Sequence, residues 1–398
     1  MKELQSQNLD CLVAAPGKTN GSYTFEDVPV RRFAVSESAT NLSEYYGEGD
    51  PMAGENFAAL LNEVQPEIVH FHAFTRGVSI RLLREAKTRS IATVFTYHTP
   101  TVSCQRGTLL RWGTDICDGR LTMRRCASCS LQGHGVSLPL AIVGGAVPGA
   151  LGDLLGSFHK AGGAWTALRT TSLVRNRHEA VLSLLNDVDR IVVLSEWTRK
   201  VLLLNRIPSG KITLSRHGLA ESSPPHLPHP PARPLKIAFM GRADRAKGVE
   251  TLIDAVRSLN DELVLDLYLL NEGPQDDYLQ KLKESAKGDS RIAFKECVSY
   301  HKVIPTLSAY HAVAVPSKIL ETGPLIVLQA FAAGVPVLGA NLGGIAELVD
   351  DGKNGILLPF NSVEHWKKAI SSCIREPELL PRLRNGISRP RSIQQVTD

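Results

Sequence analysis

Residues 316–349, PSKILETGPLIVLQAFAAGVPVLGANLGGIAELV, contain the pattern that decides the fold of this chain. The five residues before them, HAVAV, predict a buried strand, and the run LIVLQAFAAG after Pro324 has apolar residues at helical spacing. We expect the helix to begin at Pro324, whose missing N–H costs nothing at a first helical position, and to end at Gly334. The stretch therefore predicts a strand, a loop and a short apolar helix in succession.

The start of this predicted helix suits a phosphorylated ligand. Its free N–H groups and the positive end of its dipole, at Gly323 and Pro324, would face a diphosphate. Glu321 lies just outside the helix and can accept hydrogen bonds from sugar hydroxyls, while Gln329 lies lower on the same helix. A Gly-Pro pair before an apolar run is also a common helix start without any ligand, so the argument depends on several features together.

Two basic residues upstream supply those further features. A Gly-Arg pair ends at Arg242 after the first predicted strand of this half, and a Lys-Gly pair begins at Lys247, both within FMGRADRAKGVETLIDAV. Glu321 and Gln329 stand at the two ends of a Glu-x7-Glu signature, with Gln in place of the second Glu. In this order the residues resemble the donor-binding domain of retaining glycosyltransferases of the GT-B fold, in the family 4 group (glycosyl transferases group 1).

The resemblance implies a role for each of these residues. Glu321 would contact the transferred sugar, and Gln329 would bond to the ribose hydroxyls without carrying a charge. The implied catalytic residues are Glu321 and His98. The implied residues for the nucleotide-sugar donor, UDP- or GDP-linked, are Arg242, Lys247, Gly323, Pro324, Leu325 and Gln329. This donor mode needs no catalytic metal in the family.

Length and composition agree with an enzyme of two domains. The chain has 398 residues, of which 43% are hydrophobic and 21% charged, as in ordinary globular proteins. Residues 221–234, ESSPPHLPHPPARP, hold six prolines and predict a stiff linker. The predicted division is an acceptor-side domain (1–220) with a Cys-rich basic insertion (about 100–160), the linker, a donor-binding domain (235–375) and a tail (376–398).

Strand and helix patterns alternate after the linker. The segments KIAFM, LVLDLYLL, IAFKEC, HAVAV, PVLGA and GILLPF predict strands of a parallel sheet with helices on both faces. Ligands bind beyond the carboxyl ends of such strands, where Arg242, Lys247, Ser317, Glu321 and the segment 271–274 all fall. The predicted fold class is α/β, GT-B, with two Rossmann-like domains facing a cleft.

The first half carries two strands that end in histidine, EIVHFH at His72 and ATVFTYH at His98. Family members have a histidine facing the cleft at a comparable strand end, so His98 is the candidate, with a purely structural strand cap as the alternative. The segment LVAAPG, residues 12–17, corresponds to the second strand of the family pattern. The first strand and its glycine-rich loop are therefore expected to be missing.

Four of the seven cysteines are grouped within the predicted insertion. Cys104, Cys117, Cys126 and Cys129 end in a Cys-x-x-Cys pair, and four sulfurs are what a tetrahedral structural zinc requires. Free thiols, disulfides or an iron–sulfur cluster remain as alternatives. No signal peptide is recognisable, so a reducing, cytoplasmic compartment is expected, which weighs against disulfides.

The same region is basic and is followed by an apolar stretch. Residues 76–125 contain ten Lys or Arg against three Asp or Glu, whereas the whole chain carries only +5. Aromatic stacking patterns are lacking, so an anionic acceptor or peripheral contact with the inner face of a membrane fits better than nucleic acid. Residues 135–152 are uncharged but contain five glycines and two prolines, which favours an apolar loop at lipid or core over a spanning helix.

Together these patterns predict a retaining hexosyltransferase involved in glycan or polysaccharide synthesis. It would move a hexose from a UDP- or GDP-sugar to a hydroxyl of a glycan or lipid-linked acceptor. A degenerate, non-catalytic GT-B subunit that binds nucleotide or a partner transferase is the alternative, favoured by Gln329 and the missing loop. A nicotinamide dehydrogenase is excluded because no Gly-x-Gly-x-x-Gly follows a predicted strand.

Overall fold

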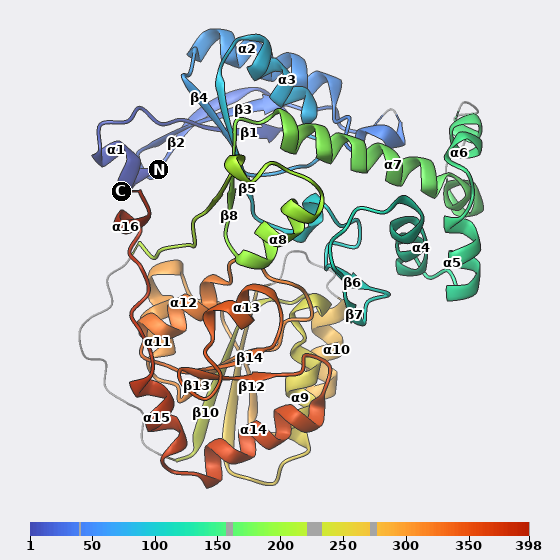
Figure 1. The fold of residues 1–398 in the computed structure, drawn as a ribbon. Helices are drawn as coiled ribbons and strands as arrows, with labels where there is room; N and C mark the ends of the chain where they lie inside the picture. Colours follow the sequence, from blue (N-terminus) through green and yellow to red (C-terminus); the bar gives the residue numbers. More distant parts are fainter. Residues whose placement is uncertain (40, 157–161, 221–232, 271–276, 398) are drawn as a thin grey trace. The chain divides into compact units, whose positions relative to one another are not determined.

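The computed structural model describes residues 1–39, 41–156, 162–220, 233–270 and 277–397 (Figure 1). The chain forms two compact units, Met1–Ser215 and Arg216–Asp398. The division falls a few residues before the predicted linker, most of which (221–232) lies outside the described residues, as does the segment 271–274.

The carboxyl-terminal unit is built on one parallel sheet of six strands, in the order β12-β11-β10-β13-β14-β15. The strands are β10 (Leu235–Arg242), β11 (Leu263–Leu270), β12 (Ile292–Lys295), β13 (Ala312–Val315), β14 (Val337–Ala340) and β15 (Gly355–Leu358). All six had been predicted, and all their pairings are parallel as expected. Their apolar side chains point to both faces, which is why the sequence shows continuous apolar runs rather than an alternating pattern.

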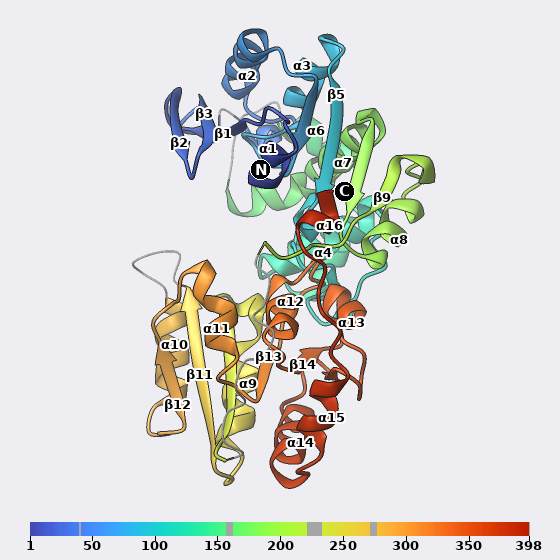
Figure 2. The ribbon, with the colours of Figure 1, turned by 90° about the vertical axis from the view of Figure 1, so that its left-hand side faces the viewer.

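Helices cover both faces of this sheet (Figures 1 and 2). Ile237 and Phe239 of β10 pack in one core cluster, and Ala238, between them, packs in another. The first cluster includes α9 (Val249–Arg257), α14 (Val363–Arg375) and α15 (Leu379–Asn385), with α10 (Asp277–Ala286) beside them. The second includes α11 (Val303–Leu307), α12 (Leu325–Ala332) and α13 (Gly343–Leu348), and a last helix, α16 (Gln394–Thr397), follows.

The amino-terminal unit contains two main sheets. Strands β4 (Ile68–Phe71), β5 (Ala92–Tyr97), β8 (Arg190–Val193) and β9 (Ile212–Leu214) pair in parallel in that order. The predicted strand at residues 12–17 is β1 (Val13–Gly17), which pairs with β3 (Val28–Ala34) in a separate sheet, with β2 (Gly21–Phe25) antiparallel at its edge. No strand joins the two sheets within the described residues.

The described residues of this unit form eight α-helices, of which the last three named here lie within the predicted insertion. The helices are α1 (Lys2–Ser6), α2 (Pro51–Val64), α3 (Ile80–Thr88), α7 (Gly163–Asp187) and α8 (Glu196–Leu204), then α4 (Met123–Gly133), α5 (Leu138–Gly145) and α6 (Gly149–Gly156). The core lies where α2, α3 and α7 meet β4, β5 and β8, with Phe95, Leu83 and Leu184 almost completely buried.

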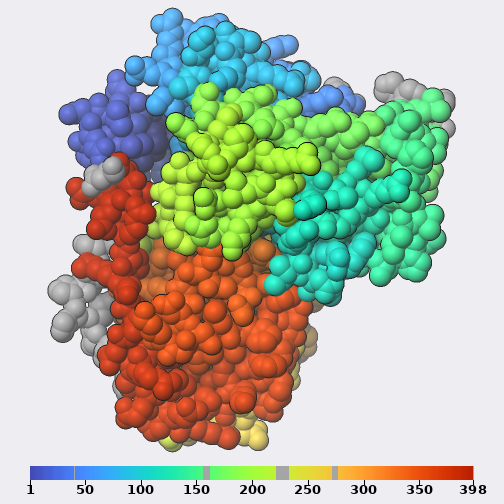
Figure 3. All heavy atoms as spheres, in the orientation of Figure 1, coloured from blue at the N-terminus to red at the C-terminus, as the bar shows by residue number. Residues whose placement is uncertain are grey.

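The apolar stretch at residues 135–152 is largely helical, with a break at Pro148 instead of an extended loop. The helical segments 138–145 and 149–155 meet at 89°. Among the described residues, no single helix has the length and apolar character needed to cross a membrane, although this bent pair passes by length and composition. In the space-filling view, α5 and α6 form part of the green surface of their unit, together with α7 (Figure 3).

Candidate functional site

Two loops of the carboxyl-terminal unit meet at one edge of its sheet. Strands β10 and β13 are parallel neighbours, with Ile237 opposite Ala312, so both of their carboxyl ends lie at this edge. The chain leaves β10 at Arg242 and turns through a short 3-10 helix, Arg245–Lys247, into α9. It leaves β13 through residues 316–324 and enters α12. The predicted gathering of residues 242–247 and 316–324 is therefore observed.

An ion pair joins these two loops. Lys247 Nζ donates a hydrogen bond to Glu321 Oε1 at 2.6 Å, and the two side chains are only 20% and 15% exposed. Ser317 Oγ donates to the same carboxylate oxygen at 2.8 Å. Charge-assisted hydrogen bonds between partly buried groups have a defined geometry, so this pair fixes the position of both charges.

A glycine allows the loops to approach so closely. Gly248 has φ +70°, and a Cβ at this position would lie 2.1 Å from the carbonyl oxygen of Pro316. The amide of Lys318 donates to the carbonyl of Ala246 at 2.7 Å, which ties the same two backbones together. The Lys-Gly pair thus places the ammonium group of Lys247 next to Glu321.

A second ion pair holds the loop 316–324 to α9. Lys318 Nζ donates to Glu250 Oε1 at 2.7 Å, and the hydroxyl of Tyr278 donates to the other carboxylate oxygen. Burial alone would raise the pKa of Glu250, but the hydrogen bonds from Lys318 and Tyr278 outweigh it and leave the pKa below its usual value. Glu250 is therefore ionised at neutral pH and holds Lys318 to α9.

A pair of glycines that the sequence analysis did not single out completes the site. Gly344, at the start of α13, donates its N–H to the carbonyl of Glu321 at 2.6 Å. A Cβ there would lie 2.7 Å from the same carbonyl oxygen, and its neighbour Gly343 has φ +49°. The Gly-Gly sequence, which two residues separate from the end of β14, was the available signal, because adjacent glycines after a strand often mark close backbone approach.

The remaining predicted donor residues lie along the same edge. Arg242 is the last residue of β10, and its guanidinium lies 3.9 Å from the carboxylate of Asp244. Pro324 is the N-cap of α12, so the helix proper begins one residue later than predicted, at Leu325. The N-cap, a proline, makes no side-chain hydrogen bond to the first turn of this helix.

Gln329 lies one turn into α12 and is only 7% exposed. Its amide is therefore packed among the residues of the helix face, whereas the charges of Arg242 and Lys247 lie nearer the surface. The position agrees with the sequence interpretation that this residue lies lower on the helix than Glu321, and its contact with a ribose stays a prediction.

The predicted histidine lies in the amino-terminal unit within a group of three. His98 Nε2 and His72 Nδ1 share a hydrogen bond of 2.9 Å at the ends of β5 and β4, and the rings stack with centroids 5.1 Å apart. His70 Nε2 lies 2.7 Å from Thr96 Oγ1. Burial, followed by the charges of neighbouring imidazoles, lowers the pKa of His70 and of His72 to about 4. Burial lowers the pKa of His98 as well, so all three rings are neutral near pH 7.

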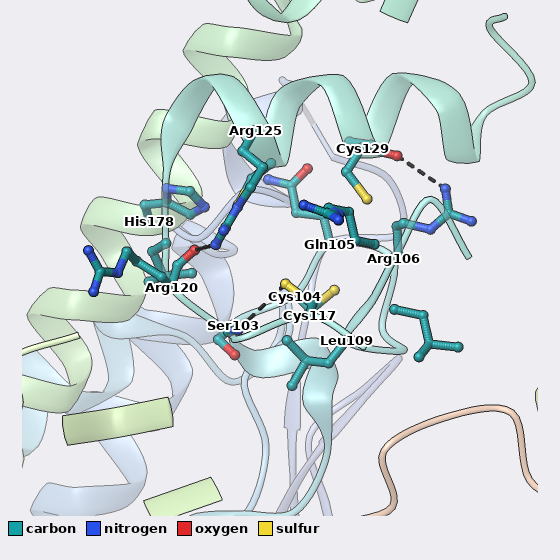
Figure 4. Close-up of a pocket in the computed structure, with 16 residues that line it drawn as sticks. Ser103, Cys104, Gln105, Arg106, Leu109, Cys117, Arg120, Arg125, Cys129 and His178 are labelled. Carbon is teal, nitrogen blue, oxygen red and sulfur yellow. Dashed lines mark hydrogen bonds between the residues drawn. The ribbon is translucent and has the colours of Figure 1, made fainter. Parts of the chain in front are cut away.

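The four grouped cysteines line one pocket between α4 and the preceding loop (Figure 4). All seven cysteines of the chain are free thiols. Across the described residues, no group of three or more His, Cys, Asp or Glu side chains is arranged so that it could hold a metal ion. The side chains as they stand therefore do not form the predicted zinc site, and zinc binding remains a prediction.

Comparison with known proteins relates the carboxyl-terminal unit to one family. Residues 228–388 match the model of Glycosyl transferases group 1. A D-inositol 3-phosphate glycosyltransferase of Rhodococcus jostii is 29% identical over 160 residues, which are 38% of this chain and 35% of that protein. The putative colanic acid biosynthesis glycosyltransferase WcaL of Escherichia coli is 30% identical over 161 residues, 39% of this chain and 40% of that protein. These matches thus span well under half of each relative.

Solved structures resemble the chain over nearly its whole length. Sucrose-phosphate synthase from Thermosynechococcus elongatus has a TM-score of 0.64 at 16% identity and covers 99% of this chain and 88% of its own. Anabaena HepE, in complex with UDP and glucose, has a TM-score of 0.57 at 14% identity and covers 93% of this chain and 84% of its own. At such identities the likeness shows the fold, and it confirms the predicted α/β GT-B class.

Proposed function

We propose that this chain is a glycosyltransferase that moves a hexose from a UDP- or GDP-sugar to a hydroxyl of a glycan or lipid-linked acceptor, with retention at the anomeric carbon. The observation that carries the proposal is the Lys247–Glu321 pair beside the start of α12, because it places a cation, a carboxylate and a helix start together. The family match of residues 228–388 supports it, and the UDP and glucose bound by HepE make UDP the first nucleotide to test.

In this proposal the carboxyl-terminal unit stabilises the leaving group. The bond between the sugar's anomeric carbon and the diphosphate breaks, and a bond from that carbon to the acceptor oxygen forms on the same face. The proton of the acceptor hydroxyl passes to the departing diphosphate. Lys247, Arg242 and the first-turn N–H groups of α12 would stabilise the charge that develops there.

Glu321 has the complementary role at the sugar. Its carboxylate accepts hydrogen bonds from Lys247 and Ser317 in the structure, and sugar hydroxyls are donors of the same kind. Oxygen Oε2 is the second acceptor position on this side chain. Binding of a donor would thus exchange hydrogen bonds of Glu321 and orient the ring. The catalytic role that the resemblance implies for His98 stays a prediction.

A thermal-shift titration tests the donor site directly. The full chain is titrated with UDP, GDP, ADP and their common sugar conjugates, since binding to the folded state alone raises its stability by RT ln(1 + [L]/Kd). We expect one nucleotide to raise the melting temperature, and Lys247→Ala and Arg242→Ala to weaken its binding about 10- to 100-fold, the loss of one charge-assisted contact. A folded protein that responds to none of these ligands would overturn the proposal.

Lys287→Ala is the matched control. It removes the same charge from an exposed helix-end lysine, 74% exposed and paired with Glu284 in the same unit. Its nucleotide affinity should equal that of the original chain. Product analysis by NMR then gives the anomeric configuration, and an inverted product would overturn retention while leaving the donor site intact.

The non-catalytic subunit is the second candidate, and two observations favour it. Gln329 is neutral where the family signature has Glu, and the amino-terminal strands form two separate sheets in the described residues. Gln329→Glu separates the candidates. A large rise in sugar transfer would identify an active site that lacks one carboxylate, and retained nucleotide binding without any transfer by either form would identify a binding subunit.

A further inference from the structure

The four cysteines Cys104, Cys117, Cys126 and Cys129 line one pocket although they span 26 residues of sequence and come from both α4 and the loop before it. Cys126 and Cys129 lie one turn apart on α4, while Cys104 and Cys117 belong to the loop between β5 and α4. Figure 4 shows Cys129 directed from the helix toward the loop sulfurs of Cys104 and Cys117. Four thiols thus face one pocket from two sides.

Two arginine contacts hold the cysteine-bearing loop against this face of α4. Arg106, two residues after Cys104, donates to the carbonyl of Cys129 at 3.1 Å and to Gln132 Oε1 at 2.6 Å. Arg125 of α4 forms a fork to the carboxylate of Asp118, directly after Cys117, with contacts of 2.5 and 3.2 Å. Each contact starts within two residues of a thiol, so the loop sulfurs stay opposite the helix sulfurs.

The backbone around the sulfurs has a geometry suited to thiolates. The N–H of Gly119 donates to Cys117 Sγ, and that of Trp112 donates to Cys129 Sγ, both at 3.5 Å. Hydrogen bonds of this kind stabilise a metal-bound thiolate and fix its direction. Gly119 has φ +77°, and a Cβ there would lie 2.5 Å from Val201 of α8, so a glycine is required to form this turn.

The turn is also anchored from outside. Asn205, at the end of α8, accepts from the N–H of Leu121 at 2.8 Å and donates to the carbonyl of Gly119 at 2.9 Å. The loop would otherwise have little structure of its own, because β6 (Leu110–Arg111) and β7 (Asp115–Ile116) are two-residue strands. Segments with so small a core are commonly stabilised by a bound metal.

The pocket also contains polar atoms whose bonding is incomplete. Both amide atoms of Gln105 and the Nε of Arg125 are buried and have no hydrogen-bond partner among the described residues. Gln105 lies between α4 and the loop sulfurs (Figure 4). Buried polar atoms are nearly always satisfied in native proteins, and an ion or water that belongs to the site is a common reason for exceptions.

We propose that Cys104, Cys117, Cys126 and Cys129 bind one structural Zn²⁺ that holds the loop to α4. Each thiol gives up its proton to solvent as its sulfur bonds to the metal, and no electrons are transferred because Zn²⁺ has no redox chemistry. Four protein ligands leave no open position for substrate, so the ion is structural. The resulting dianionic complex is compensated by Arg106, Arg120 and Arg125, which line the same pocket.

The thiols must move together to reach this state. They do not surround a single point in the structure, and the ligands of a structural zinc seldom hold their final positions without the ion. The arginine contacts and the anchored turn already hold the loop backbone beside α4. Tetrahedral sulfur ligation is typical both of zinc and of iron–sulfur clusters. Zinc fits this pocket better, because the four sulfurs then bind one ion and not a cluster of several atoms.

Metal analysis of the purified full chain tests the proposal. Protein expressed with added zinc and kept reduced should contain about one zinc per chain by mass spectrometry. Cys117→Ser and Cys129→Ser should bind less than about a tenth as much. Cys11→Ser and Cys297→Ser remove free thiols elsewhere and are the controls, which should keep the metal of the original chain.

A measurement on the original chain keeps the test valid if the variants fail to fold. A zinc chelator should release the metal, and the number of thiols reacting under native conditions should rise from at most three to include the four pocket cysteines. Folded protein that contains no zinc and shows all four pocket thiols reactive from the start overturns the proposal, as does bound iron or a disulfide. Nucleotide binding is measured separately, so failure here leaves the proposed transferase activity untouched.

Discussion

Lys247 Nζ donates to Glu321 Oε1 at 2.6 Å, so a diphosphate that binds this lysine competes with a carboxylate already beside it. The same carboxylate would repel a diphosphate while attracting sugar hydroxyls. Glu321 would therefore weaken binding of the diphosphate and strengthen binding of the sugar. It should thus determine how strongly the site prefers a nucleotide sugar over the free nucleotide.

Glu321→Gln should reverse that preference. The substitution keeps the shape of the side chain and removes its charge, so UDP should bind equally well or up to about 10-fold more tightly, while UDP-glucose should lose its advantage over UDP. Calorimetric titration of both ligands measures the ratio, with Glu284→Gln, a charge removed from an exposed side chain of the same unit, as the control. Parallel weakening of both ligands would mean instead that Glu321 holds the loop in place.

The histidine group predicts how stability depends on pH. Burial lowers the pKa of His70 and of His72 from 6.5 to about 4 in the folded state. Between these values the unfolded chain binds more protons than the folded one, so stability falls as pH falls from 6.5 to 4 and is fully present above 6.5. Melting temperatures measured across this range should drop less steeply for His70→Asn. His301→Asn, which removes an exposed imidazole outside this group, is the control.

At the scale of elements, the turn between β10 and α9 depends on one glycine. Gly248→Ala would force a side chain into φ +70° and into the carbonyl of Pro316, 2.1 Å away. Gly288→Ala is matched to it, since Gly288 has φ +83° but nothing within 4 Å of its Cβ position. We expect about 1 kcal/mol of destabilisation at Gly288 from the backbone alone and about 2–4 kcal/mol at Gly248, measured by urea unfolding.

The same pair of variants links the turn to the site. Nucleotide binding should weaken in Gly248→Ala, because the turn that carries Lys247 must shift, and should not change in Gly288→Ala. Equal destabilisation by the two substitutions would show that the loops can separate without cost, contrary to the close approach seen here.

Helix α5 has exposed apolar side chains, and it follows a basic segment of the sequence. Leu140 and Val143 are 65% and 67% exposed, whereas Ala141 between them is buried. An anionic lipid surface would match both these side chains and the ten basic residues of segment 76–125. The double variant Leu140→Ser/Val143→Ser should therefore reduce sedimentation with phosphatidylserine vesicles several-fold.

Ile68→Ser/Phe25→Ser is the control for this experiment. These side chains are 61% and 64% exposed, so the variant removes a comparable apolar area from strands β4 and β2. It should sediment like the original chain. Unchanged sedimentation of the α5 variant, or equal loss in both, would remove α5 as a membrane contact.

The elements differ in how far the sequence could predict them. The strands of the second unit were predictable because buried parallel strands are continuous apolar runs, as in the LVLDLYLL of β11. The structure of residues 135–152 was harder to predict, because their glycines and prolines lower the helix propensity. In the structure Ala141 and Gly145 pack closely on α4, where a Cβ on Gly145 would lie 2.0 Å from Ser128. Tertiary packing outweighed propensity there.

The site shows the same contrast. Arg242, Lys247 and Glu321 were predictable because parallel strands bring their carboxyl ends to one edge. The contact from Gly344 to Glu321 was not, because it depends on the distance between two loops whose contacting residues lie 23 positions apart in sequence. A sequence pattern can place residues at an edge, but the packing of backbones on one another requires the structure.

At the scale of the whole molecule, each unit has its own hydrophobic core. The first is centred on Phe95 and Leu184, and the second on Ile237 and Leu265. Units with separate cores can unfold independently, so a single melting temperature need not describe this chain. A ligand that binds one unit then stabilises that unit by mass action.

Calorimetry should therefore resolve two transitions, of which the nucleotide raises one. Because Arg242, Lys247 and the start of α12 all belong to the unit Arg216–Asp398, its transition should rise by about 2.7 kcal/mol of stability when the ligand is at 100 times its Kd. Gly248→Ala should lower that same transition, which identifies it, and Lys247→Ala should abolish the ligand's effect. If both transitions rise together, the ligand also binds Met1–Ser215, and His98 at the end of β5 becomes the first residue there to replace.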